Sequence, residues 1–339
     1  HGEHGAILVR DSRRCEIVNC RANAVWDALN LRHSDECNVY GCDFSHTSDT
    51  CLKLWHACRN RIVNCDLSYG IRIDPGEVHA RDSSGVLIES GSDGNWFYGH
   101  DMTHGGDGLF IRVLNGWMSC HNVFINNDCS YANNNAVEAW ADHNVYIGNK
   151  ANYSSYGFWL GNSDYTYLEG NEAAFNGDPA YHNNAPESFG NAGIAIVNGS
   201  GSHSVLRGNH VHDNCGPGIA IRNSLDNPSR HWVIEGNVIE RNRDCGRYRG
   251  HGIYLKHARL IALADNELRD NAGEPVMRDG DVADVTWCDA AANGAADSVA
   301  CGAPAGDARL ELNMAYGDYP RAGAPVAFKC AGGEGHVWD

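Results

Sequence analysis

The chain has 339 residues, of which 42% are hydrophobic and 20% are charged. This apolar content supports a folded core and excludes wholesale disorder. No uninterrupted apolar run approaches the roughly 18 residues that a membrane-spanning helix needs. With 26 Lys and Arg against 43 Asp and Glu, the formal net charge is −17. Such an acidic surface repels nucleic-acid phosphates, so we expect no DNA or RNA partner.

The 14 cysteines are a large number, and no two of them form a Cys-x-x-Cys pair. Metal sites in cytosolic proteins commonly use such pairs, whereas secreted proteins use cysteines in disulfides. We therefore expect a secreted or periplasmic protein with a few disulfides and no metal site. The chain begins at His1, without Met or a signal peptide, as expected of a processed or trimmed chain.

A repeat organises most of the chain. Short apolar runs open with a small residue at intervals of 21 to 36 residues. These opening residues are Ala6, Ala28, Cys51, Gly85, Gly108, Ala136, Gly157, Gly193, Gly218 and Gly252. The clearest copies span 193–214, 218–242 and 252–271. Each copy holds two runs with strand-like alternation, separated by polar turns, and no long stretch has helical periodicity.

The second run of most copies ends in Asn, which is typical of a buried amide ladder between stacked repeats. The residues concerned are Asn19, Asn64, Asn126, Asn149, Asn171, Asn209, Asn237 and Asn266. Strands and turns with this period predict an all-β right-handed parallel β-helix of about ten coils over residues 1–275. A leucine-rich repeat is the less favoured alternative, because its motif is absent. We expect residues 276–339 to cap the last coil.

Insertions and cysteines also follow the repeat. The longer steps place insertions near 70–84, 176–192 and 242–251. We predict two cysteine columns, Cys15, Cys37 and Cys58 in one, and Cys20, Cys42 and Cys65 in the other. Stacked cysteines at the coil spacing lie within disulfide range. The alternative is that they are small apolar thiols that fill an inner column.

We expect the second and fourth residues after each opening residue to point outward, on the face opposite the apolar residues between them. In the middle coils this stripe holds charged and aromatic residues, for which we expect a substrate-binding role: Arg32, Lys53, Trp55, Glu89, Arg112, Trp140 and Trp159. Rings stack on the apolar faces of sugars, and charged groups bind hydroxyls or uronates. We prefer Glu89 to Asp74, because residues 71–74 and 87–90 are too close to occupy separate coils. The alternative is an ordinary solvated sheet face.

Two carboxylates in this stripe are candidate catalytic residues. Asp107 lies between glycines where a strand begins, and Glu138 lies one coil later. At about 4.8 Å per coil and 3.3 Å per residue, their Cα atoms would be on the order of 11 Å apart, which allows a glycosidase pair. We expect Arg112 to pair with Glu138 and His104 to tune Asp107. The simpler alternatives are a turn-capping Asp107 and a Glu138 that belongs to a surface ion pair.

Four segments carry a resemblance to a known superfamily: GGDGLFIR, NNDCSYANNNAVEAW, YGFWLGNSDYTYLEGN and NAGIAIVNGS. With the repeat, they resemble secreted bacterial parallel β-helix proteins of the pectate-lyase-like superfamily. The resemblance covers nearly all of residues 5–275 and implies a carbohydrate substrate. The adjacent aspartates of polygalacturonase-like hydrolases are absent, and the Asp-Pro-His motif of alginate epimerases reads Asp74-Pro75-Gly76 here.

The sequence thus predicts an enzyme that degrades a polysaccharide, with glycoside hydrolysis by Asp107 and Glu138 as the first interpretation. That interpretation needs no cofactor. The alternative is a lyase or epimerase for a uronate polymer, in which Arg or Lys abstracts a proton and calcium is held by Glu89 or Asp107. A third interpretation is a non-catalytic sugar-binding solenoid.

Overall fold

The computed structural model describes residues 5–72, 83–114, 116–179, 191–197, 202–245 and 248–288, together with strands at 310–314, 326–330 and 336–338. These residues form strands and turns, and none of them belongs to a helix that could cross a membrane. Asp74, which we considered for the outward stripe, lies outside the described residues.

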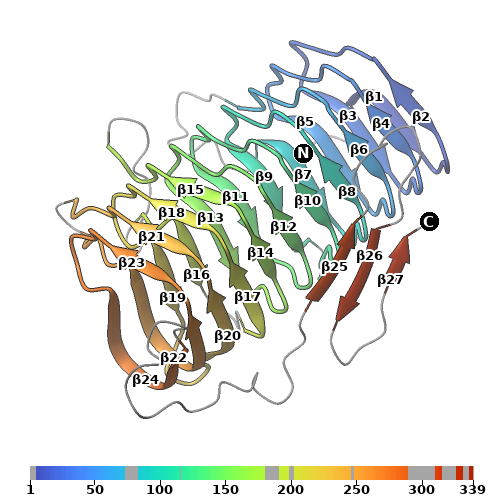
Figure 1. Ribbon diagram of the computed structural model, residues 1–339. Helices are drawn as coiled ribbons and strands as arrows, with labels where there is room; N and C mark the ends of the chain where they lie inside the picture. Colours follow the sequence, from blue (N-terminus) through green and yellow to red (C-terminus); the bar gives the residue numbers. More distant parts are fainter. Residues whose placement is uncertain are drawn as a thin grey trace.

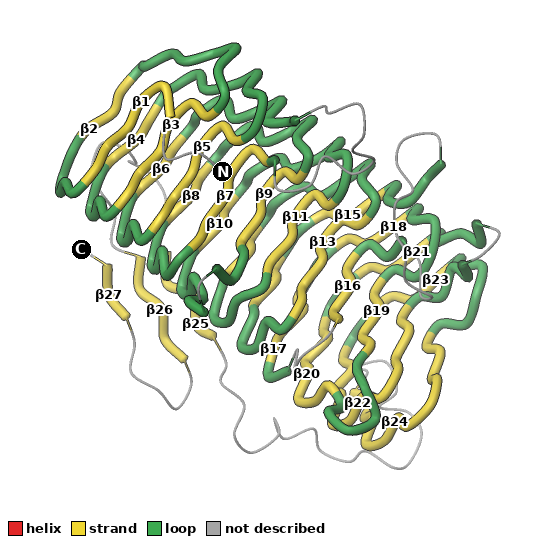
Figure 2. Tube along the Cα trace, turned by 180° about the vertical axis from the view of Figure 1, so that it is seen from behind, coloured by secondary structure: helices red, strands yellow, loops and turns green. Residues whose placement is uncertain are grey.

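The chain winds into a stack of coils, and strands of successive coils pair in parallel (Figure 1, Figure 2). The first face contains β1 (Gly5–Arg10), β3 (Asp27–Arg32), β5 (Thr50–Trp55), β7 (Ser84–Glu89), β9 (Asp107–Ile111), β11 (Asn135–Ala139), β13 (Tyr156–Gly161), β16 (Ile194–Val197) and β19 (Ile219–Arg222). The second face contains β2 (Glu16–Val18), β4 (Asn38–Tyr40), β6 (Arg61–Val63), β8 (Trp96–Tyr98), β10 (Val123–Ile125), β12 (Val145–Ile147), β14 (Tyr167–Glu169), β17 (Ser204–Arg207) and β20 (Ser229–Glu235).

The long strand β22 (Ile253–Ala264) pairs with β19 of the first face and with β20 of the second, and so joins the two faces into one 20-stranded sheet. A second long strand, β24 (Val276–Cys288), pairs with β22. A third face contains β15 (Glu172–Ala174), β18 (His210–His212), β21 (Val238–Glu240) and β23 (Glu267–Arg269). The predicted parallel β-helix is confirmed. The parallel pairing continues to Cys288, beyond the predicted boundary at residue 275.

The three remaining strands, β25 (Leu310–Met314), β26 (Val326–Cys330) and β27 (His336–Trp338), pair antiparallel with one another. They lie within the predicted capping segment, whose role stays a prediction.

The interior is filled by apolar side chains that stack on like residues of the next coil. Leu29, Leu52 and Val86 are fully buried and are neighbours in register on β3, β5 and β7. Phe97 and Phe124 stack at 4.9 Å between ring centroids, one coil apart. Close packing of these columns supplies the main favourable term in folding.

A buried amide ladder runs along the stack, as predicted. In it each Nδ2 donates to the Oδ1 of the next coil at 2.9–3.1 Å, through Asn127, Asn149, Asn171, Asn209, Asn237 and Asn266. The ladder residue in its coil is Asn127 and not the predicted Asn126, and the predictions for Asn19 and Asn64 were wrong. These three residues have φ of 49–53° and occupy the left-handed position just before the ladder column. Asn tolerates this conformation because its short side chain bonds locally.

Two further ladders were not predicted. One links Asn60, Asn95, Asn122 and Asn144, and the other links Asn176, Asn214, Asn242 and Asn271. Each ladder satisfies backbone groups at a turn that recurs in every coil, for example where Asn95 Nδ2 donates to the carbonyl of Ala57 at 3.0 Å.

The cysteine columns are partly as predicted. Cys20, Cys42 and Cys65 align and continue the column of the main amide ladder toward the first coil. Cys58 does not align with Cys37, because Asn60 occupies that position. All six predicted column cysteines are free thiols. Cys42 and Cys65 belong to the apolar core and Cys20 packs against it, as in the apolar-filler alternative. The structure instead has a disulfide between Cys215 and Cys245, which the sequence did not reveal.

The ladder predicts a measurable cost for removing one amide. Asn171→Ala removes the acceptor for the side-chain amide of Asn149 and the donor to the carbonyl of Tyr146. The Asn149 amide and the Tyr146 carbonyl then stay buried without these hydrogen bonds. We expect the free energy of unfolding to fall by about 2 kcal/mol or more in urea titrations. Asn38→Ala, at a half-buried position of β4, is the control, and an equal loss in both variants would contradict the prediction.

Candidate functional site

The outward stripe on the first face has the predicted register. Lys53, Leu87, Phe110, Glu138 and Trp159 are successive neighbours on β5, β7, β9, β11 and β13. Their side chains lie on the face opposite the core-facing leucines and valines. The choice of residues 87–90 over 71–74 is therefore confirmed, since β7 pairs with both β5 and β9.

Buried charges form a chain across three coils of this stripe. The ammonium of Lys53 lies 3.6 Å from Oε2 of Glu89, and the guanidinium of Arg112 binds Oε1 of the same carboxylate. Lys53 and Glu89 are buried, whereas the side chain of Arg112 is 15% exposed. Arg112 thus forms an ion pair with Glu89, and the expected pairing of Arg112 with Glu138 stays a prediction. Glu89 is therefore a positioning residue for Arg112, because it has no exposed surface to offer a substrate.

Arg32 and Trp55 lie next to this chain and contact each other. The guanidinium of Arg32 lies 4.6 Å from the ring centroid of Trp55, a cation–π arrangement, and Arg32 is 7% exposed. The Lys53 ammonium lies 6.0 Å from the same ring. Cations therefore occupy surface of the Trp55 ring that we expected a sugar to cover.

Asp107 and Glu138 are held by one residue, Asn135. The backbone N–H of Asn135 donates to Asp107 Oδ1 at 2.9 Å, and its side-chain amide donates to Glu138 Oε2 at 2.7 Å. Asn134 also donates to Asp107, and Trp140 Nε1 donates to Glu138 Oε1 at 2.7 Å. Both oxygens of Glu138 thus accept a hydrogen bond, which fixes the orientation of its carboxylate. Asp107 is only 2% exposed, while Glu138 is partly exposed.

Asn135 was not identified from the sequence as a site residue. The signal was present, because the run Asn133-Asn134-Asn135 directly precedes the strand that carries Glu138. Polar side chains at the start of a strand can bond both to the previous coil and to their own strand.

Trp140 and Trp159, two of the three predicted tryptophans, differ in their surroundings. The Trp140 ring lies over Gly161, where an added Cβ would come within 2.6 Å of Trp140 Cε3. Trp159 is 8% exposed and packs against Tyr156, with ring centroids 4.6 Å apart, in a small apolar cluster that includes Ala195. Trp140 is the more exposed of the two and the better candidate for contact with a sugar.

His104 lies in a column of stacked rings at a turn. Its ring is 4.6 Å from Tyr69 and 5.0 Å from Tyr131, centroid to centroid, and its Nδ1 is 2.9 Å from the hydroxyl of Thr103. The full column contains His46, Tyr69, His104, Tyr131, Tyr153 and Phe175. The surroundings of His104 therefore indicate a structural role and do not support the predicted tuning of Asp107.

The residues expected to hold calcium do not fit that ion. Glu89 is already bound by Lys53 and Arg112, and Asp107 accepts two N–H donors on one oxygen. In the described part of the chain, no group of three or more His, Cys, Asp or Glu side chains is arranged to hold a metal. We therefore derive no step through calcium.

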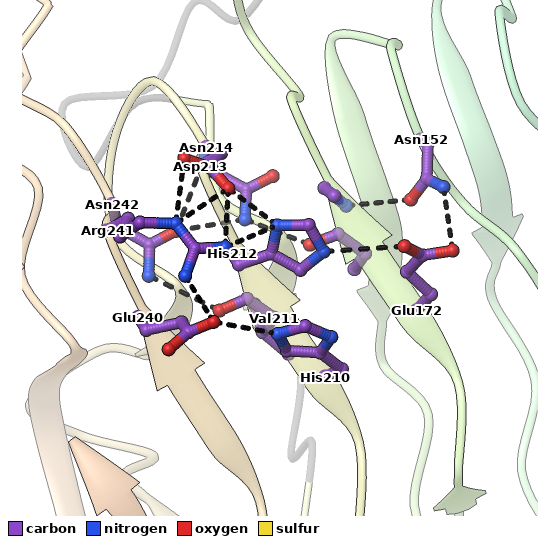
Figure 3. Close-up of polar contacts among 12 residues, drawn as sticks. Asn152, Glu172, His210, Val211, His212, Asp213, Asn214, Glu240, Arg241 and Asn242 are labelled. Atoms are coloured by element: carbon purple, nitrogen blue, oxygen red, sulfur yellow. Dashed lines mark hydrogen bonds and ion pairs between the residues drawn. The ribbon is translucent and has the colours of Figure 1, made fainter. Parts of the chain in front are cut away.

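A second dense polar cluster lies on the third face (Figure 3). His212 Nδ1 is 2.7 Å from Asp213 and its Nε2 is 3.3 Å from Glu172, while Arg241 binds both Asp213 and Glu240. Each of these carboxylates has a cationic or imidazole partner on its own or a neighbouring coil. The cluster therefore stabilises the stacking of β15, β18 and β21.

The family described as right handed beta helix region matches residues 4–173 and 112–288. The chain belongs to this family. No curated protein matches the chain.

Several solved structures are similar to the chain at low identity. The A-module of the mannuronan C-5 epimerase AlgE6 from Azotobacter vinelandii is 10% identical, with a TM-score of 0.46, over 80% of this chain and 65% of that one. A mannuronic acid specific polysaccharide family 6 lyase from human gut microbiota is 13% identical, with a TM-score of 0.42, over 84% and 85%. PfbA, a surface adhesin of Streptococcus pneumoniae, is 10% identical, with a TM-score of 0.21, over 86% and 69%.

One further carboxyl, at the start of β3, has an unusual environment. Burial, then repulsion from Asp49, raises the pKa of Asp27 from 3.8 to about 6, although Lys53 and the N–H of Thr50 oppose the rise. The unfolded chain loses this proton near pH 4, whereas the folded protein holds it up to about pH 6. Stability is therefore lost as the pH rises through this window.

Asp27→Asn tests this pH dependence. The neutral amide avoids ionisation in the buried site, so we expect the variant to be more stable than the parent above pH 6, by roughly 3 kcal/mol. The difference should vanish at pH 4, where the parent carboxyl is protonated. Urea titrations at both pH values measure it, with Asp226→Asn at an exposed position as the control. An equal difference in the free energy of unfolding at both pH values would contradict the raised pKa of Asp27.

Proposed function

We propose that this protein is an enzyme that acts on a uronate-containing polysaccharide, by β-elimination or by epimerisation at C5. The observation that carries the proposal is the diagonal placement of Arg112 and Glu138 on adjacent strands. Trp140 continues the column of Arg112 and bonds to Glu138. From the strand spacing, the Cα atoms of Arg112 and Glu138 are roughly 8 Å apart. Both side chains are partly exposed, unlike Asp107, Lys53 and Glu89.

The proposed chemistry begins at the carbon next to the uronate carboxylate. Arg112, held by Glu89, neutralises that carboxylate through charge-assisted hydrogen bonds and so stabilises the negative charge that develops when the proton leaves. Glu138, oriented by Asn135 and Trp140, accepts the C5 proton. In elimination the C4–O bond then breaks, the leaving oxygen takes a proton from water, and Glu138 returns its proton to solvent. In epimerisation C5 takes a proton from water on its other face, and Glu138 again returns its proton to solvent.

Glycoside hydrolysis is the second candidate, because Asn135 bonds both Asp107 and Glu138 and so places two carboxylates side by side. It requires both carboxyl groups to flank the scissile bond. With 2% of its surface exposed, Asp107 is poorly placed to donate a proton to a sugar oxygen. This difference in exposure favours chemistry at a single carboxylate.

Composition and the disulfide support two further parts of the proposal, the location of the enzyme and its partner. The enzyme is secreted or periplasmic, as the 14 cysteines first indicated and as the disulfide between Cys215 and Cys245 supports. Its partner is the polysaccharide chain, and nucleic acid is disfavoured by the charge of −17. A sugar-binding solenoid without catalysis is the remaining alternative, and it predicts binding with no turnover.

Glu138→Gln tests the proposal. The amide has the shape of the carboxylate, but it accepts from only one of the two N–H donors and cannot take up a proton, so we expect kcat to fall by about 10²–10⁴ with a smaller change in KM. The assay screens diverse uronate polymers and neutral polysaccharides for unsaturated products, which absorb in the ultraviolet, for new reducing ends, and for inverted C5 centres by NMR. Glu235→Gln, at an ion pair with Arg207 on the second face, is the matched control.

The three readouts separate the candidates. Unsaturated product or inverted C5 from a uronate polymer, lost in Glu138→Gln, supports the proposal. Reducing ends without unsaturation, lost in both Asp107→Asn and Glu138→Gln, would assign hydrolysis instead. Full turnover in Glu138→Gln would contradict both.

A further inference from the structure

The coil of β9 carries extra residues where the outward stripe ends. Leu87 and Phe110, which are in register on β7 and β9, are 23 residues apart. Beyond the stripe, Asn95 and Asn122 of one amide ladder are 27 residues apart. The coil of β9 therefore has four residues more than the preceding coil between its first-face strand and this ladder. In solenoids, insertions of this kind commonly lie beside the binding face.

The extra residues form a short turn that brings Trp117 to the surface. The backbone N–H of Trp117 donates to the carbonyl of Leu114 at 3.1 Å. Gly116, with a φ of 79°, allows the chain to reverse direction there. The next residue, Met118, packs against the apolar core and so anchors the end of the turn. Trp117 itself is 60% exposed.

The protein holds the indole of Trp117 on one side. A Cβ added to Gly91 would lie 3.6 Å from Trp117 Cε3, so the ring lies over the turn that follows β7. The imidazole of His56 meets the indole almost at a right angle, with the ring centroids 6.1 Å apart. His56 is itself fixed, because its Nδ1 lies 2.9 Å from the carbonyl oxygen of Ser90. The indole is thus positioned before a ligand binds, and most of its surface is open to solvent.

This ring lies beside the site of the proposed function. Gly91, which the indole covers, follows Glu89 by two residues, and Glu89 binds the guanidinium of Arg112. Trp117 also follows Arg112 by five residues, through the short turn. A flat, apolar indole therefore stands next to the cation that we expect to bind a uronate carboxylate. Such rings stack on the apolar faces of sugars.

We infer that Trp117 stacks on a pyranose ring of the polysaccharide, next to the sugar whose carboxylate binds Arg112. The inference rests on the proposed function for the uronate class of the substrate. The stacking contact itself needs an apolar sugar face and no charge. Arg112 thus selects the acidic group, and Trp117 adds affinity for the neighbouring sugar. The two contacts combine only in a ligand that spans both.

Isothermal titration with hexamers of galacturonate, mannuronate and β-1,4-linked glucose tests the role of Trp117. The parent carries Glu138→Gln, so that the ligand is not consumed. Addition of Trp117→Ala should raise the Kd of the uronate hexamer that binds by roughly five- to thirtyfold. Trp117→Phe keeps a ring, and should raise this Kd by about threefold at most. Trp26→Ala is the matched control, because Trp26 is 49% exposed and directly precedes β3, at the other end of the first-face strands.

The outcomes distinguish this inference from the proposed function. Equal affinities in Trp117→Ala, Trp26→Ala and the parent would overturn the stacking role, even if the enzyme turns over uronates. Affinity for the glucose hexamer that depends on Trp117, with no binding of either uronate hexamer, would support the stacking role and overturn the proposed function. Absence of binding to all three hexamers would overturn both. A lower melting temperature of Trp117→Ala with an unchanged Kd would assign Trp117 a structural role and overturn the inference.

Discussion

Parallel pairing in strict register between successive coils is the constraint on which the rest of the structure depends. It places each residue directly above its counterpart one coil earlier, at the spacing of hydrogen-bonded strands. A position in the repeat must therefore suit a residue that stacks on copies of itself. Amides satisfy this rule because each one both donates and accepts, and so Asn149, Asn171 and Asn209 form a continuous ladder. Aromatic rings satisfy it by stacking, as His104 does between Tyr69 and Tyr131.

Charged residues do not satisfy the rule, since like charges in register repel each other. Along the outward stripe the structure resolves this by alternation, with Glu89 between Lys53 and Arg112. Where a carboxyl is buried beside another, the protein carries a cost, as the pKa of Asp27 shows, which burial and then Asp49 raise. Buried ion pairs of this kind rarely add net stability compared with apolar residues. The chain of Lys53, Glu89 and Arg112 is therefore better explained by function than by folding.

The sequence was sufficient for the fold and for the register of the stripe, because the small opening residues mark each coil independently of the insertions. It was not sufficient for side-chain partners. Arg112 has carboxylates at comparable reach on two neighbouring coils, and only packing decides that it binds Glu89. A repeat of residue types also does not show which of two adjacent residues is buried. Asn126 fills the left-handed position that Gly148 fills in the next coil, so the ladder residue is Asn127, and Cys58 lies two residues before the position that aligns with Cys37.

The same constraint separates two carboxylates that looked equivalent in the sequence. Asp107 lies at the start of its strand, where the next coil stacks over it and Asn134 and Asn135 occupy its oxygen. Glu138 lies three residues after Asn135 along β11, where its neighbours in register are Phe110 and Trp159. Its carboxylate is held by Asn135 and Trp140 and is still partly exposed. A site with one partly exposed carboxylate and one partly exposed guanidinium, that of Arg112, is suited to removing a proton beside a substrate carboxylate. It is less suited to a reaction that needs two carboxyl groups on opposite sides of a bond.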